Sequence, residues 1–169
     1  MCEGCWEVGG RGAWLSPSET AGADPSLGMG LSGLFRFRPS WAVELAYDRH
    51  PGSIPDGPNE TFSFLTVTGH ITFRSAREQR TRPYLLIGAG FAFDHISSGS
   101  VDVSLPGGAV TAHGEPASDH GLAYSLGGGS VTSLSNQIWL RLEAKWLRWS
   151  SYGLDQDSIQ VAAGLWYRF

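Results

Sequence analysis

Charged and titratable residues recur at every second position inside segments of the chain that are otherwise apolar. Residues two apart on an extended strand share one face of that strand, so each set points to one side. The residues concerned are Arg36, Arg38, Glu44, Asp48, His70, Arg141, Glu143, Lys145 and Arg168. Charges on an enclosed face must pair, because an unpaired buried charge is strongly unfavourable. The set therefore predicts a polar, salt-bridged network that fills an interior, and a narrow ion path is the alternative.

Other chemically reactive side chains give weaker signals. Cys2 and Cys5 form a C-x-x-C pair, but a redox or zinc role needs a βαβ context or a second ligand pair, and the sequence has neither. His95 follows an aspartate and precedes Ser97 and Ser98, but neighbours in sequence are poor evidence for a triad, which is defined by spatial geometry. We therefore expect no catalytic, cofactor-binding or metal-binding residues.

The segment 158–169 indicates what kind of element carries such faces. Apolar residues occupy every second position, and they are Ile159, Val161, Ala163, Leu165, Tyr167 and Phe169. Strict alternation over this length predicts a strand with different surroundings on its two sides. The segment is longer than an ordinary strand and fits a tilted strand that crosses a membrane. Closing the sheet into a barrel would leave no backbone edge exposed to lipid.

Similar alternation predicts seven further strands and long loops between alternate pairs of them. The eight segments are Trp6–Leu15, Gly28–Arg38, Trp41–Arg49, Thr61–Arg74, Pro83–Asp94, Gly121–Leu134, Ile138–Trp149 and Ser158–Phe169. The long loops lie at about 15–27, 50–60, 95–120 and 150–157, and the other connections are shorter. Long loops at one rim and short turns at the other are typical of outer-membrane barrels with both termini in the periplasm. We expect an N-terminal tail (1–5) and one all-β domain (6–169), an eight-stranded antiparallel up-and-down transmembrane β-barrel.

Composition agrees with this interpretation and limits the function. Charged residues make up 17% of the 169 residues, below the roughly 25% of a typical soluble domain. The net charge of −4 provides no basic surface for nucleic acid. No apolar stretch is long enough for a transmembrane helix. A soluble, lipocalin-like ligand-binding barrel remains an alternative, although such a protein has no need of large apolar side chains on its outer face.

The chain resembles the OmpA/OmpX-type outer-membrane proteins over essentially its whole length. The resemblance rests on residues 28–38 and 41–48, on P-Y-L-L-I-G-A-G at 83–90, on L-R-L-E-A-K at 140–145 and on the C-terminus. Gly164, Tyr167 and Phe169 match the family's insertion signal, whereas Ala162 stands where the family usually has a polar residue.

This resemblance implies an outer-membrane location, a structural or surface-binding role, no cofactor, and barrel-assembly machinery and outer-membrane lipid as partners. Acidic residues concentrate in the long loops, where they could share Ca²⁺ or Mg²⁺ with lipopolysaccharide phosphates. Arg74, Arg77, Arg80 and Arg82 lie in one turn at the opposite rim, where they could face anionic lipid head groups. Some small barrels of this class modify lipid A, and a lipid A acyltransferase or deacylase is the enzymatic alternative.

Overall fold

The computed structural model describes residues 3–17, 25–53, 59–73, 80–97, 99–105, 108–114, 116–151 and 154–169. Eight antiparallel strands close into a barrel in the order β1-β10-β9-β8-β5-β4-β3-β2, and β6 pairs with β7 in a separate two-stranded sheet. The strands are β1 (Cys5–Pro17), β2 (Ser26–Arg38), β3 (Trp41–Ser53), β4 (Asn59–Thr72), β5 (Thr81–Ile96), β6 (Gly99–Leu105), β7 (Gly108–Gly114), β8 (Ala117–Ser133), β9 (Ile138–Ser151) and β10 (Leu154–Arg168). The expected eight-stranded antiparallel barrel is confirmed.

Strand alternation gives the barrel an apolar outer belt. Trp6 and Trp14 on β1 point outward and are 55% and 49% exposed. They lie eight residues apart, which is about 26 Å along a strand at about 3.3 Å per residue. At a tilt of about 40° this corresponds to about 20 Å along the barrel axis, close to the apolar band of a transmembrane barrel. Between these levels the outer face carries leucine, valine, isoleucine and phenylalanine side chains on every strand of the barrel.

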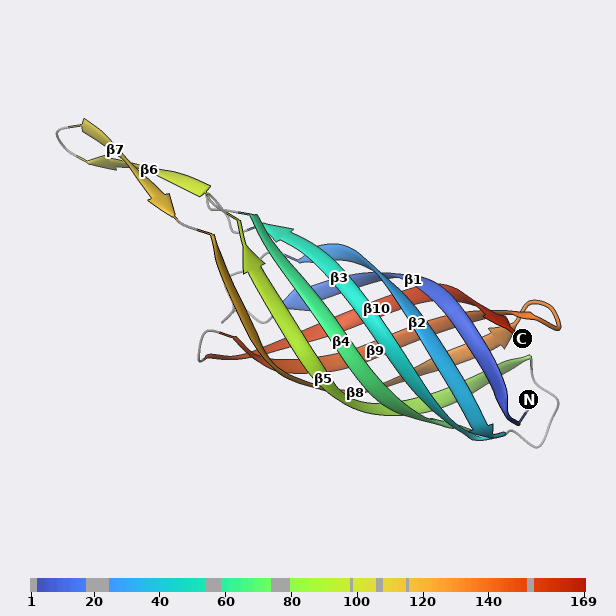
Figure 1. The fold of residues 1–169 in the computed structure, drawn as a ribbon. Helices are drawn as coiled ribbons and strands as arrows, with labels where there is room; N and C mark the ends of the chain where they lie inside the picture. Colours follow the sequence, from blue (N-terminus) through green and yellow to red (C-terminus); the bar gives the residue numbers. More distant parts are fainter. Residues whose placement is uncertain are drawn as a thin grey trace.

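Both termini lie at one end of the barrel, and the β6–β7 hairpin projects from the other (Figure 1). At the end with the termini, β2 joins β3, β4 joins β5 and β8 joins β9. The hairpin occupies part of the 95–120 segment that the sequence analysis expected to be a long loop. No helix of the described residues is long and apolar enough to cross a membrane.

The strands extend further than the sequence pattern predicted. Strand β3 continues through Pro51, which pairs with Thr61, and only two residues separate β9 from β10 where a longer loop was expected at 150–157. Strand β1 begins at Cys5, inside the expected tail. The apolar–polar alternation ends where the strands extend past the lipid-facing belt. Hydrogen bonding between the strands continues beyond that level, because their backbone N–H and C=O groups still need partners.

Candidate functional site

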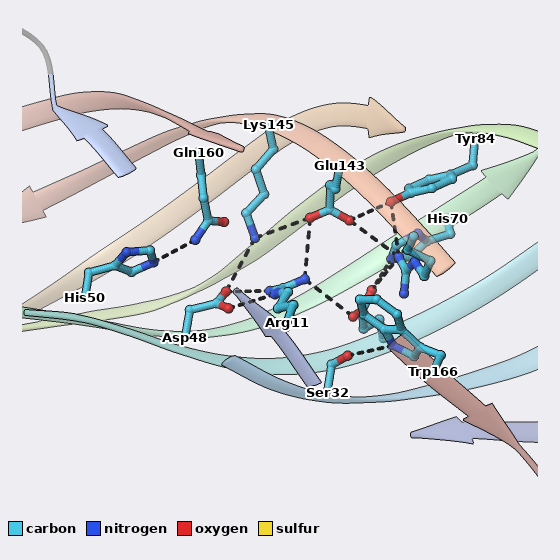
Figure 2. A network of polar contacts seen from close by, with 12 residues as sticks. Arg11, Ser32, Asp48, His50, His70, Tyr84, Glu143, Lys145, Gln160 and Trp166 are labelled. Atoms are coloured by element: carbon cyan, nitrogen blue, oxygen red, sulfur yellow. Dashed lines mark hydrogen bonds and ion pairs between the residues drawn. The ribbon is translucent and has the colours of Figure 1, made fainter. Parts of the chain in front are cut away.

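The centre of the barrel holds a network of buried ion pairs (Figure 2). Arg11 projects inward from the middle of β1 and binds Asp48 of β3 with both ends of its guanidinium: Nε donates to Oδ1 at 2.7 Å and Nη2 to Oδ2 at 2.5 Å. Its Nη1 lies 3.5 Å from Glu143 Oε1 and 3.6 Å from Glu44 Oε1. Bidentate arginine–carboxylate pairs of this kind are among the strongest and most directional polar contacts. Arg11 thus joins β1, β3 and β9 across the lumen.

Arg141 is the second centre of the network. Its Nη2 donates to Glu44 Oε2 at 3.0 Å and lies 3.4 Å from both Glu143 Oε2 and the Tyr84 hydroxyl. The guanidinium also stacks between two rings, 5.1 Å from the centroid of Tyr84 and 4.5 Å from that of Trp166. A buried cation is stabilised by aromatic faces as well as by carboxylates. Arg141 is therefore held both by charge and by packing.

The contacts of His70 identify its tautomer. Its Nδ1 lies 3.3 Å from Arg141 Nη2, and its Nε2 lies 2.8 Å from Glu44 Oε2. Because arginine has no acceptor, Nδ1 must accept, and the carboxylate at Nε2 requires a donor there. The neutral ring with its proton on Nε2 satisfies both neighbours. His70 thus lies between Glu44 and Arg141, with Nδ1 hydrogen-bonded to Arg141 and Nε2 in close contact with the Glu44 carboxylate.

Lys145 and Arg168 extend the network towards opposite ends of the barrel. Lys145 Nζ lies 3.6 Å from Asp48 Oδ2 and 3.7 Å from Glu143 Oε1. At the end with the termini, Arg168 donates to Glu7 Oε1 through Nε at 3.0 Å and through Nη2 at 2.6 Å. Glu7 and Arg168 face each other on β1 and β10, the two strands that close the barrel. This pair therefore holds the closing seam.

Apolar clusters close the lumen on both sides of the network. The outer cap, inside the barrel at the end with the β6–β7 hairpin, consists of Leu15, Phe62, Phe64, Ala92, Ala123, Leu147 and Trp149. Trp149 contacts Phe62 and Phe64 edge to face, with centroids 5.9 and 5.2 Å apart. At the end with the termini, Val131, Trp139 and Trp166 form a second buried cluster, the inner cap. Both clusters are therefore apolar layers packed inside the barrel next to the polar network.

A pair of carboxyl groups lies beyond the outer cap. Glu60 and Asp94 point inward from β4 and β5, both are buried, and their side chains share a hydrogen bond. Their level is above the lipid-facing belt, since the outer face there carries Thr61 and His95. Burial, together with the neighbouring Asp94 carboxylate, raises the pKa of Glu60 to about 7. Two adjacent carboxylates disfavour full ionisation, so this pair retains a proton near neutral pH.

The structure places most of the sequence-predicted network residues in the lumen, and Arg38 is the exception. The inward-facing ones are Arg36, Glu44, Asp48, His70, Arg141, Glu143, Lys145 and Arg168. The ladder between β2 and β3 shifts register between Phe35 and Arg38, so that Arg38 pairs with Trp41, which is 47% exposed on the outer face. Arg38 is therefore exposed and lies outside the network.

Sequence reasoning missed three members of the network: Glu7, Arg11 and Tyr84. A signal for the first two was present: Trp6 and Val8 point outward, so the odd-numbered positions of the same strand, which include Glu7 and Arg11, must point inward. Glycines on both sides of Arg11 hid this pattern. Tyr84 resembles the outward-facing aromatic residues in type, and its contacts with Glu143 at 2.8 Å and with Arg141 give it a role in the network.

The residues of the expected insertion signal lie on both faces of β10. Tyr167 and Phe169 are exposed on the outer face, with ring centroids 5.0 Å apart. Gly164 faces inward, where a Cβ would lie 2.7 Å from both Arg11 Cβ and a ring carbon of Trp166. Glycine at this position leaves the space that Arg11 and Trp166 occupy, which is a structural requirement independent of any signal.

No family model and no curated protein matches the chain. Solved structures match it over nearly its full length. Neisserial surface protein A is 14% identical, covering 98% of this chain and 96% of that one, with a TM-score of 0.68. Ail, the attachment invasion locus protein of Yersinia pestis, is 19% identical (99% and 100% covered, TM-score 0.53), and outer membrane protein W of E. coli is 16% identical (100% and 100%, TM-score 0.52). The chain has the fold of these eight-stranded outer-membrane barrels.

Proposed function

We propose that this protein is a bacterial outer-membrane barrel that spans the bilayer as a sealed cylinder and acts as a structural or surface-binding protein, not as a pore or an enzyme. The observation that carries the proposal is the filled lumen. Ion pairs connect β1, β3 and β9 across the interior, and an apolar cap lies on each side of them. A barrel of this strand number has an interior just large enough for its own side chains.

The outer surface supports the membrane location. Leu27, Met29 and Leu31 of β2 are among the most exposed side chains of the described residues, and similar apolar residues cover the outer face of every other barrel strand. Continuous apolar surface on this scale would make a water-soluble protein aggregate. The same surface is satisfied by acyl chains. These considerations disfavour the soluble, ligand-binding alternative.

The two histidines buried inside the barrel, His50 and His70, are held by neighbouring side chains. His50 is fully buried beside Phe64 and lies 2.8 Å from Gln160 Nε2, and His70 is held between Glu44 and Arg141. Histidines engaged in this way are not available to activate a serine nucleophile, as a lipid A acyltransferase or deacylase would require.

The partners in this proposal are outer-membrane lipid, lipopolysaccharide around the outer rim, and the barrel-assembly machinery, which would recognise Gly164, Tyr167 and Phe169. The β6–β7 hairpin, projecting beyond the barrel wall (Figure 1), is the element best placed to contact a ligand outside the cell. Binding residues on outer-membrane barrels belong mainly to such outer connections, because the wall itself is covered by lipid.

Topology and sealing can be tested separately. An epitope tag inserted between β6 and β7 should be labelled by antibody on intact cells. The control tag, in the turn between β8 and β9 (134–137), should be labelled only after the outer membrane is permeabilised. The reverse pattern would contradict the proposed orientation, and labelling of neither tag in a folded barrel would contradict the location.

Planar-bilayer recordings test the seal. The wild-type barrel should give no steady ion current, and a Phe64→Ala/Trp149→Ala variant, which opens the outer cap, should conduct no better while the ion pairs remain. Adding Arg11→Met and Lys145→Met to that variant should let water reach further into the lumen but should still give no steady current, because Arg141 and the inner cap remain. Steady currents through the wild-type barrel would establish the narrow-pore alternative instead.

A further inference from the structure

A small cavity lies in the lumen between the central ion pairs and the end with the termini. Its volume is about 10 Å³, and its polar lining consists of Glu7, Arg36, His70, Thr72, Tyr84 and Arg141. About one water-sized particle needs this much space. The lining is dominated by hydrogen-bond donors, because two arginines face a single carboxylate, that of Glu7.

Two of these donors have no hydrogen-bond acceptor in the structure. They are the guanidinium donors Arg36 Nε and Arg141 Nη1, and each residue is only 3% exposed. Arg36 Nε lies 3.6 Å from Glu7 Oε1, beyond hydrogen-bond distance, and Arg36 Nη1 reaches only the Thr72 hydroxyl at 3.5 Å. Glu7 itself is engaged by Arg168 at 2.6 Å. A buried guanidinium with unused donors is unfavourable unless an acceptor fills the space beside it.

The charges of the lumen favour an anion as that acceptor. Between the two caps and at the inner mouth, five basic residues face four acidic ones: Arg11, Arg36, Arg141, Lys145 and Arg168 against Glu7, Glu44, Asp48 and Glu143. His70 is neutral in the tautomer that its contacts require. Arg11 and Lys145 share Asp48 and Glu143, and Arg141 takes Glu44. Arg36 is therefore the cation with the weakest carboxylate contact, because it shares Glu7 with Arg168, and Arg141 and Arg168 act on it as further like charges.

We propose that this cavity binds one small monovalent anion, chloride, between the Arg36 and Arg141 guanidinium groups. A halide accepts hydrogen bonds from several donors at once and would balance the remaining positive charge. Bulky polyatomic anions such as gluconate are excluded by the volume of the cavity. The bound anion completes the filling of the lumen beside the inner cap.

The first test compares unfolding in two salts at constant ionic strength. The folded barrel in detergent should be more stable in sodium chloride than in sodium gluconate, whose anion is too large for the cavity. The equilibrium constant should change by about tenfold when chloride exceeds its dissociation constant tenfold. Arg36→Gln should abolish the difference. The matched control is Arg38→Gln, two residues away on β2 but exposed, and it should keep the full difference.

The second test locates the anion directly. Crystals grown with bromide should give an anomalous peak beside Arg36 and Arg141 in the wild-type protein and in Arg38→Gln, and none in Arg36→Gln. A site that holds water only would give neither a peak nor a salt-specific change in stability, and this result would overturn the proposal even if the barrel folds and seals as described. Equal loss in the Arg38→Gln control would also overturn it.

Discussion

Removal of Arg11 tests whether the lumen network stabilises the barrel. Arg11→Met keeps much of the volume of the side chain and deletes the cation that binds Asp48 at 2.5 and 2.7 Å and approaches Glu143 and Glu44. Breaking a buried ion pair from one side typically costs about 3–5 kcal/mol, because the remaining charge stays buried without a partner. Lys145 lies 3.6 Å from Asp48 and Arg141 binds Glu44. These cations offset part of the loss, so we expect about 3 kcal/mol.

The assay is reversible urea unfolding in phospholipid vesicles, followed by tryptophan fluorescence and by the change in gel migration on heating. Arg38→Met is the matched control: Arg38 is exposed at the end of β2 and lies outside the network, and its replacement should change the free energy of unfolding by no more than about 0.5 kcal/mol. A loss below about 1 kcal/mol for Arg11→Met, or an equal loss for both variants, would refute the stabilising role of the network.

A second replacement separates the pair from its surroundings. When Asp48→Leu is added to Arg11→Met, neither buried charge of the bidentate pair remains. The double variant should therefore be more stable than the sum of the single losses implies, by about 1–3 kcal/mol. Strict additivity would mean that the two side chains act independently, in contradiction to the observed geometry.

Three further results are expected. Leu31 is 69% exposed on the outer face, and Leu31→Arg should lower the stability of the barrel in bilayers by about 2–4 kcal/mol, the cost of arginine near the bilayer midplane. An exposed site in water usually changes stability by less than about 0.5 kcal/mol, and a change this small would contradict the lipid-facing assignment. The pKa of Glu60 is raised to about 7, so this side chain binds a proton more tightly in the folded than in the unfolded state. The stability that it contributes should be present below about pH 4.5 and lost as pH rises through 7. In urea titrations Glu60→Gln should flatten this part of the pH profile, and an unchanged slope would exclude Glu60 as its cause. Phe169→Ser removes the ring that contacts Tyr167 and should reduce the folded, heat-modifiable fraction of the protein in cells. Refolding of the purified chain into detergent should change little. Equal defects in both assays would indicate that Phe169 acts in folding and not in recognition by the barrel-assembly machinery.

The sequence by itself determined the architecture. Alternation of apolar and polar residues has a period of two in most barrel strands, and this period is a local property of the chain, so their two faces could be predicted residue by residue. The exceptions are the glycine-rich stretches around Arg11 and at 127–129, where the pattern is blurred. The outward position of Val161 and Leu165 and the inward position of Glu143 and Lys145 follow directly from the alternation. The ends of the strands could not be predicted in the same way, because pairing beyond the apolar belt depends on the neighbouring strand.

Only the tertiary structure decided which inward residues meet. Arg11 contacts Asp48, Glu143 and Glu44, and these distances depend on the register and tilt of strands that are far apart in the chain. Register is set cooperatively around the closed barrel, so no single segment contains it. The register shift that turns Arg38 outward, the space that Gly164 leaves, and the donors of Arg36 and Arg141 without acceptors appear only when all eight strands are assembled.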